Sequence, residues 1–415
     1  MRTSNARKAY SDRSISLSVR EHGAIETGGG QVYNHAVKRC AGALVFIFTA
    51  LAISAFVQAH GASAKEPIWA YGFLTPPALG EKAPPPQNPP THRLRPNEDQ
   101  VEQLRPRRIE GSSATYTLLD VRDGHNVIDW FPGDHPSPMP DIIAHGPKSL
   151  GETARGCGSC HLPHGKGRPE NAQPGGLPFD YIVRQLHDFR LGFRRSADWR
   201  KQNTPTMVNL AMAMTDEEIH AAAAYFSAVK WNSSWVRVVE TSLVPKTRIQ
   251  GNLFIAPKHE LTEPIDGRII EVPANQEQAE LYRNPHSGWI AYAPVGSIAR
   301  GRELVTTGGS MTVGNQIIQG KTTACAGCHG PDLMGMADVP PLAGRSPSYL
   351  ARQLYDFQQG TRNGSSAPLM RPIVANLTEA DIVSITAYVA SLVPGAPISP
   401  SRPLLPVPVT STARR

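Results

Sequence analysis

Residues 157–161 read CGSCH and residues 325–329 read CAGCH. In each run two cysteines stand three positions apart, and a histidine follows the second cysteine at once. Cysteines at i and i+3 lie on one face of a helical turn, so both thiols can reach the same porphyrin. The histidine leaves the same turn and can bind the iron. The pattern is typical of c-type haem attachment, and its two copies predict two covalently bound haems and electron-transfer chemistry.

The residues predicted to hold the two haems are the attachment cysteines Cys157, Cys160, Cys325 and Cys328 and the proximal ligands His161 and His329. Zinc binding or thiol redox chemistry is the alternative use of a Cys-x-x-Cys run. A zinc site needs four ligands, but the only other cysteine is Cys40, which lies beside an N-terminal apolar run. A thioredoxin-like site needs a βαβ setting, which the sequence lacks. The haem interpretation is therefore favoured.

The two motifs belong to an internal repeat with a period of 168 residues (157 to 325). Residues 181–189 (YIVRQLHDF) match residues 349–357 (YLARQLYDF), and residues 204–229 match residues 367–392. A repeat this long indicates two copies of one domain rather than a solenoid. The apolar spacing within each copy predicts helices, and Thr215 and Thr378 are predicted to cap the last helix of each copy.

The predicted fold is mainly α, with two helical domains in tandem. The chain divides into a leader (1–64), a proline-rich arm and hairpin (65–138), a first helical domain (139–230), a β-containing insert (231–295), a second helical domain (296–394) and a proline-rich tail (395–415). Runs of β-branched residues predict the strands of the insert. Within the arm, residues 115–131 are predicted to form a hairpin that turns at Asp123-Gly124.

The N-terminal segment has the features of an export signal. Lys38-Arg39 precedes the apolar run 41–57, and Ala62-Ser63-Ala64 fits a cleavage site. The sequence therefore predicts a periplasmic protein, held at the inner membrane if the leader is not cleaved. The segment carries +4 of the formal charge of +7, which leaves +3 for the remainder. Without a basic cluster interleaved with aromatic residues, nucleic-acid binding is not expected.

The sixth iron ligand decides whether each haem is closed. Met207 and Met370 occupy matching positions, which we predict to be a loop just before the last helix of each copy. A thioether there would close the iron and raise its potential. The alternative for each is a core methionine. Near Met207, Met214 aligns with Leu377 and is predicted to be a core residue, whereas Met212 is a weaker competitor as ligand.

The histidine ring nitrogen that does not bind iron needs a hydrogen-bond acceptor. The loop Val339–Leu342 is predicted to supply a carbonyl to His329, while residues 172–174 at the corresponding place in the first copy differ in sequence. We therefore expect the surroundings of His161 to differ in detail. Four histidines without a partner in the other copy are predicted to be surface or capping residues: His164, His187, His220 and His286.

Both copies resemble class I cytochrome c domains, in the Cys-x-x-Cys-His motif, the helix opened by Tyr181 or Tyr349, the methionine and the terminal helix. In tandem they are similar to the two-domain dihaem c-type cytochromes of bacterial periplasms. The resemblance covers roughly residues 139–230 and 296–394. It implies all-α domains around each haem and one-electron transfer between a membrane complex and a terminal acceptor. The long insert departs from the compact members of that family.

The sequence thus predicts an exported dihaem cytochrome that carries electrons, with His161/Met207 and His329/Met370 as ligand pairs, rather than a catalyst. One alternative is a cytochrome subunit of a periplasmic dehydrogenase, with the insert and the arm as its docking surface. Another is a dihaem enzyme, such as a peroxidase or thiosulfate dehydrogenase, that uses the first haem. The expected partners are redox proteins, either a membrane complex or a periplasmic dehydrogenase.

Overall fold

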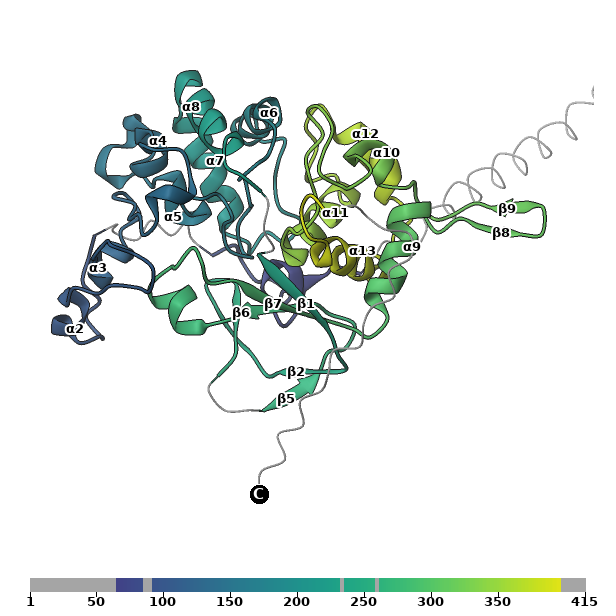
Figure 1. Ribbon diagram of the computed structural model, residues 1–415, viewed down its shortest axis with the longest axis horizontal. Coiled ribbons are helices and arrows are strands. Elements are labelled where there is room, and N and C mark those ends of the chain that lie inside the picture. Colours follow the sequence, from purple (N-terminus) through teal and green to yellow (C-terminus); the bar gives the residue numbers. More distant parts are fainter. Residues whose placement is uncertain (1–64, 85–91, 232–234, 258–260, 397–415) are drawn as a thin grey trace, which may run out of the picture. The chain divides into compact units, whose positions relative to one another are not determined.

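The structure is a computed structural model that describes residues 65–84, 92–231, 235–257 and 261–396 (Figure 1). All described residues belong to one compact unit. The predicted leader and nearly all of the predicted tail lie outside the described residues. Within the described part no single helix is long and apolar enough to cross a membrane. Helices α12 (Ala367–Val374) and α13 (Glu379–Ser391) reach that length and apolar composition only when taken together, and they are bent by 115°.

The first helical domain is built from short helices around one apolar core. Its helices are α4 (Asp141–Ala144), α5 (Cys157–His161), α6 (Phe179–Arg190), α7 (Asn203–Ala213) and α8 (Asp216–Ser227), with the 3-10 segment Lys148–Thr153 between α4 and α5. The core joins Ile143 of α4 to Ile219 of α8, both fully buried. Helix α8 begins where predicted, because Thr215 and Glu218 form a reciprocal capping box.

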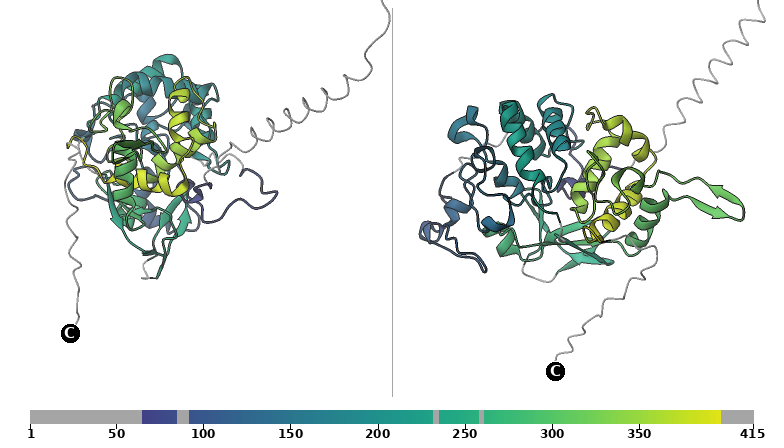
Figure 2. Two further views of the ribbon diagram at one scale, coloured as in Figure 1. Left: turned by 90° about the vertical axis from the view of Figure 1, so that its right-hand side faces the viewer. Right: turned by 45° about the horizontal axis from the view of Figure 1, so that its top comes forward.

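The second helical domain repeats this plan. Its helices are α9 (Ser297–Thr307), α10 (Ala326–His329), α11 (Pro347–Gln358), α12 and α13. Thr378 caps α13 with Asp381, as predicted. Helices α9 and α13 cross closely at Gly301, where an added Cβ would clash with the Ser384 carbonyl oxygen. A hairpin absent from the first domain, β8 (Met311–Val313) and β9 (Gln316–Ile318), follows α9 and extends away from these helices (Figure 2).

Residues between the two helical domains form strands. A three-stranded sheet has the order β1 (Val236–Glu240), β7 (Trp289–Ala293), β6 (Ile270–Pro273), with β1 and β7 parallel and β6 and β7 antiparallel. Two further antiparallel pairs are β2 (Leu243–Pro245) with β5 (Thr262–Pro264) and β3 (Arg248–Gln250) with β4 (Leu253–Ile255). A π-helical turn spans Glu277–Leu281. The parallel pairing needs a long crossover, which the other strands of this segment supply.

The proline-rich segment at the N-terminus packs on the second helical domain. Its 3-10 turn Ile68–Tyr71 buries Trp69 and Tyr71. The Tyr71 hydroxyl donates to Asp356 Oδ1 (2.7 Å), and Trp69 Nε1 donates to Glu379 Oε1 (3.1 Å). Tyr71 keeps its proton, because burial and the neighbouring Asp356 carboxyl raise its pKa well above the ordinary value. These buried aromatic residues make the start of the segment an arm rather than a free linker.

The hairpin predicted at residues 115–131 is wrong. The described residues there form a helix, α3 (Leu118–Val121), which follows α2 (Gln100–Leu104). Thr117 and Asp120 form a capping box that starts α3. Asp123 accepts a hydrogen bond from the backbone of His125, so its side chain closes a local turn instead of a strand connection.

A buried carboxyl group joins the strands to the second helical domain. Glu271 of β6 is 1% exposed and accepts hydrogen bonds from Ser346 Oγ (2.7 Å) and the Ser348 amide (3.3 Å) at the start of α11. Burial raises the pKa of Glu271 to about 7, although these hydrogen bonds lower it. The carboxyl group is therefore protonated in acid and ionised in mild base.

Glu271→Gln is expected to flatten the pH dependence of stability. The folded chain holds the Glu271 proton up to about pH 7, whereas its ordinary pKa is 4.5. The stability contribution is thus fully present below about pH 4.5 and is lost as pH rises to about pH 7, a change of about 3 kcal/mol. Denaturant unfolding of both proteins at about pH 5 and about pH 8 measures this difference. Equal losses in both proteins would contradict the assignment.

Candidate haem sites

The second motif opens into one cavity together with the predicted methionine. Cys325, Cys328, His329 and Met370 all line a cavity of about 340 Å³ between α10, α11 and α12. The rest of its wall is mostly apolar, with residues such as Leu342, Leu350, Leu354, Phe357, Val374 and Leu377. Two cysteines, an imidazole and a thioether on one apolar cavity are the groups that attach and ligate a haem. The residues present therefore fit that cofactor.

The Nδ1 nitrogen of His329 lies 2.8 Å from the carbonyl oxygen of Pro340. A carbonyl oxygen only accepts, so Nδ1 carries the proton and Nε2 keeps a free lone pair. Burial lowers the pKa of His329, which keeps the ring neutral. The prediction that the loop Val339–Leu342 supplies the acceptor is confirmed.

The first motif has the same arrangement. His161 Nδ1 lies 2.8 Å from the Ala172 carbonyl oxygen, and in both domains the acceptor stands 11 residues after the histidine. Burial also lowers the pKa of His161. The expectation that the surroundings of His161 differ at this point is wrong, because a backbone carbonyl can accept whatever the side chain of its residue.

The first cysteine of each motif, Cys157 or Cys325, is held in apolar surroundings. Burial raises the pKa of the Cys157 thiol to about 12 and that of the Cys325 thiol to about 11. No group of three or more His, Cys, Asp and Glu side chains in the described ranges is placed to hold a metal ion.

The candidate sixth ligands stand on helices, not on the predicted loop. Met370 lies in α12 and lines the second cavity, and Met207 lies at the matching place in α7, half-buried. Met214 is buried in the core of the first domain, as its alignment with Leu377 predicts. Met212 is 64% exposed, so it is poorly placed as a ligand.

The two helical domains meet through a reciprocal pair of arginines that sequence reasoning missed. Arg194 donates to the Tyr349 hydroxyl (3.0 Å) and to Gln353 Oε1 (2.8 Å) in the second domain. Arg362 donates to the Tyr181 hydroxyl (2.7 Å) and to Gln185 Oε1 (2.8 Å) in the first domain. The six partners are three pairs separated by the repeat period, which is the signal that could have found them: Tyr181/Tyr349, Gln185/Gln353 and Arg194/Arg362.

This interface reaches the second cavity. Tyr181, Arg184 and Gln185 of the first domain line that cavity beside Tyr349 and Arg362 of the second. Arg194 and Arg362 are 7% and 9% exposed, and the oxygens that accept their cross-domain hydrogen bonds are neutral. The opposite charge comes from two buried carboxyl groups, because Asp188 interacts electrostatically with both arginines and Asp356 interacts with Arg194.

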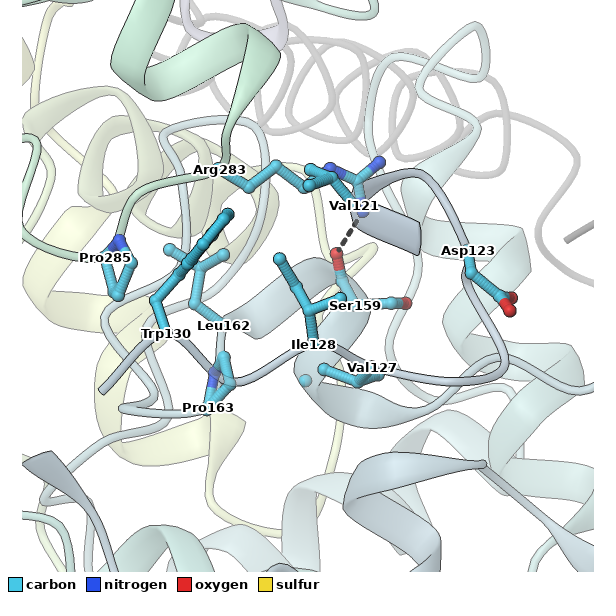
Figure 3. Close-up of a pocket in the computed structure, with 11 residues that line it drawn as sticks. Val121, Asp123, Val127, Ile128, Trp130, Ser159, Leu162, Pro163, Arg283 and Pro285 are labelled. Carbon is cyan, nitrogen blue, oxygen red and sulfur yellow. Dashed lines mark hydrogen bonds between the residues drawn. The ribbon is translucent and has the colours of Figure 1, made fainter. Parts of the chain in front are cut away.

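The outer face of the first motif is covered by other parts of the chain. A small cavity of about 20 Å³ is lined by Ser159 together with Val127, Trp130 and Arg283 (Figure 3). Arg283 Nη1 donates to the Ser159 carbonyl oxygen (3.3 Å), and burial lowers the pKa of Arg283 to about 10. Residues before the first domain and residues near β7 thus both contact α5.

His164 is buried rather than at the surface, so that prediction is wrong. Its Nε2 lies 2.7 Å from the Pro285 carbonyl oxygen, and its ring meets Trp235 edge-on at 5.4 Å. Burial lowers its pKa to about 3, so the ring is neutral and joins the first domain to the residues before β7. His286 lies nearer the surface, where it stacks on Phe131 and pairs with Asp134 (2.6 Å).

Comparison with known proteins agrees with this geometry. The cytochrome c family model matches residues 147–230 and 311–393. The chain is 39% identical over 72 residues to cytochrome c-554(548) of Halomonas halodenitrificans, covering 17% of this chain and 87% of that protein. It is 39% identical over 92 residues to cytochrome c4 of Pseudomonas aeruginosa, covering 21% of this chain and 45% of that protein.

A longer but weaker match is the thiosulfate dehydrogenase electron acceptor of Thiomonas intermedia, 23% identical over 252 residues, or 60% of this chain and 82% of that protein. The matches to cytochrome c4 proteins of three species span about half of those relatives' own length. Two family domains, each with an attachment motif, hold two covalently bound haem c groups. The chain belongs to the cytochrome c family, of which it contains two domains in tandem.

Proposed function

We propose that the protein is an exported electron carrier with two six-coordinate haems, ligated by His161/Met207 and His329/Met370. Cys157 and Cys160 bind the first porphyrin through thioethers, and Cys325 and Cys328 bind the second. The haem supplies a one-electron iron couple. The observation that carries the proposal is that His329 and Met370, from α10 and α12, line the same cavity as the two cysteines.

The protein side chains set how that couple behaves. The carbonyl groups of Ala172 and Pro340 fix the ring orientation of the two histidines and leave Nε2 for the iron. A thioether ligand and an apolar wall both favour the reduced iron, which raises the potential. A carrier with both axial positions occupied has no open site for a substrate.

Support for electron exchange between the two haems comes from the interface. First-domain residues line the second cavity, and the paired hydrogen bonds of Arg194 and Arg362 hold the two domains in contact. We therefore propose that electrons pass between the two haems. The two domains contact each other directly here, and no other described segment lies between them.

A second candidate is a subunit that accepts electrons from a dehydrogenase. The match to a thiosulfate dehydrogenase electron acceptor covers 82% of that relative and 252 residues, which is longer than either haem domain of this chain. In this version the partner is a periplasmic dehydrogenase bound at fixed stoichiometry. Co-purification with such an enzyme from the native host would favour it over a freely diffusing carrier.

Spectroelectrochemical titration of the purified protein tests the carrier proposal. We expect two reversible one-electron steps per chain and no turnover of thiosulfate or hydrogen peroxide beyond that of free haem. Turnover of either substrate would favour the dihaem enzyme instead. Recovery of the haem-loaded protein from the cytoplasm, rather than from the periplasm or inner membrane, would contradict export.

A further inference from the structure

The two attachment motifs differ in what covers their outer faces. Gly158 and Ser159 of the first motif are buried, and an added Cβ on Gly158 would lie 2.9 Å from Val127 Cγ1. Gly327, which corresponds to Ser159 in the repeat, is exposed, and an added Cβ there would meet nothing within 4 Å. The outer face of α10 is therefore open to solvent where that of α5 is closed.

The second cavity also opens to solvent. Cys328 and Leu369 both line it and are both exposed, and Leu369 is 75% exposed. The residue at the Leu369 position in the first domain is Thr206, which is half-buried and donates to the Gln202 carbonyl oxygen (2.9 Å). A haem attached at Cys328 is thus approachable from outside between α10 and α12.

In the sequence, the hairpin β8–β9 closely precedes the attachment motif that borders this opening. Only six residues separate Ile318 from Cys325. The Gly320 amide donates to Ser310 Oγ and the Thr322 amide to the Gly308 carbonyl oxygen, both just after α9. All six strand residues are exposed. The pairing places Met311, Val313 and Ile318 on one face of the hairpin. An isolated two-stranded hairpin is at best marginally stable, so such an apolar face gains from a partner.

The charge of the hairpin limits what that partner can be. Residues 307–320 contain no Asp, Glu, Lys, Arg or His. The nearest cation, Lys321, is paired with Asp381 (2.9 Å). Anionic membranes are bound by apolar surfaces with several flanking lysines or arginines, whereas the lysine next to this hairpin already pairs with a carboxylate. A charged protein surface would lose its hydration here without gaining an opposite charge.

We propose that β8–β9, with Gly327, Cys328 and Leu369, forms the docking face through which the second haem exchanges electrons with a soluble redox protein whose own docking patch is apolar and uncharged. Each encounter moves one electron, so the second haem and the partner's metal centre change oxidation state by one in opposite directions, and no bond forms or breaks. This inference rests on the proposed carrier function. The first haem then exchanges electrons with such partners only through the second.

Stopped-flow electron transfer tests the docking face. The reduced full-length holoprotein is mixed with an oxidised type 1 copper protein that has an uncharged apolar patch at its copper site. We expect Val313→Ser combined with Ile318→Ser to slow the second-order rate about tenfold, because few side chains carry most of an interface's energy. The rate for both proteins should depend only weakly on salt. Both substitutions are at exposed positions and are expected to leave folding intact.

The matched control is Leu191→Ser combined with Val295→Ser, two apolar residues that are 63% and 73% exposed and lie outside the docking face. An equal slowing in this control, or no slowing in the hairpin variant, would overturn the proposal. A hairpin-dependent dimer in sedimentation, or hairpin-dependent binding to phospholipid vesicles, would also overturn it. Each result would show that something other than a redox protein occupies the docking face. Oxidation by ferricyanide should be unchanged in the variant, and failure of the unmodified protein to react with ferricyanide would instead reject the carrier function.

Discussion

Met370→Ala is expected to open the second haem and lower its potential. Met370, on α12, lines the second cavity together with the attachment motif and is the proposed sixth ligand. Its removal would take away a thioether that favours the reduced iron. Since axial ligation spans about 0.8 V of haem potential, we expect one of the two midpoint potentials to fall by on the order of 0.2 V. The reduced variant should also bind carbon monoxide at one haem per chain.

The matched control for this variant is Met336→Ala. Met336 belongs to the same domain but is 54% exposed and does not line the cavity. It should leave both potentials and the carbon monoxide stoichiometry unchanged. An unchanged spectrum and potential in Met370→Ala would contradict the assigned ligand. At the first haem, Met207→Ala is compared in the same way with Met212→Ala, a substitution at an exposed position. Only Met207→Ala should change a potential and the carbon monoxide stoichiometry.

Arg194→Leu is expected to cost stability and to weaken the contact between the two haem domains. The substitution removes hydrogen bonds to Tyr349, Gln353 and Gln185, two of which cross the interface. Gln185 and Gln353 keep Arg362 as a charged donor, whereas the Tyr349 hydroxyl loses its charged partner. Because one hydrogen bond to a charged group contributes about 1.5–3 kcal/mol, we expect a loss of about 3 kcal/mol in the free energy of unfolding. Loss of a buried cation should also lower a haem potential.

Arg195→Leu is the matched control, because Arg195 is the next residue, is exposed and bonds through its side chain only to the Gly192 carbonyl oxygen. It should change stability by less than about 0.5 kcal/mol. Arg194 and Arg362 share Gln185 and Gln353, so each single variant leaves both amide oxygens one donor. The double variant removes both donors and should lose more than the sum of the two single losses. Additive losses, or equal losses in both single-site variants at 194 and 195, would contradict the shared network.

The parts of the fold that repeat could be predicted from the sequence. Aligning Cys157 with Cys325 placed both helical domains, both helix caps at Thr215 and Thr378, and the core role of Met214. The haem attachment motifs were recognisable because their chemistry fixes both residue type and spacing. The acceptor for His329 was also predictable, because the proline-rich loop has few other conformations.

Features that depend on the backbone or on non-local contacts were not predictable. The Ala172 carbonyl accepts from His161 although nothing in the Ala172 side chain marks it. Around Asp123-Gly124 the turn signal was real, but the capping box at Thr117 directed the preceding residues into a helix. His164 had no partner in the repeat, because it contacts Pro285 and Trp235, which lie outside both helical domains.

Ligand binding to the native protein tests the closed-carrier account most directly. The full-length holoprotein is exposed to cyanide when oxidised and to carbon monoxide when reduced, and the haem spectra are followed over time. With His161/Met207 and His329/Met370 in place, neither ligand should bind rapidly at either haem. Rapid binding of either ligand at one haem of the unmodified protein would contradict the account and would identify that haem as an open, catalytic site.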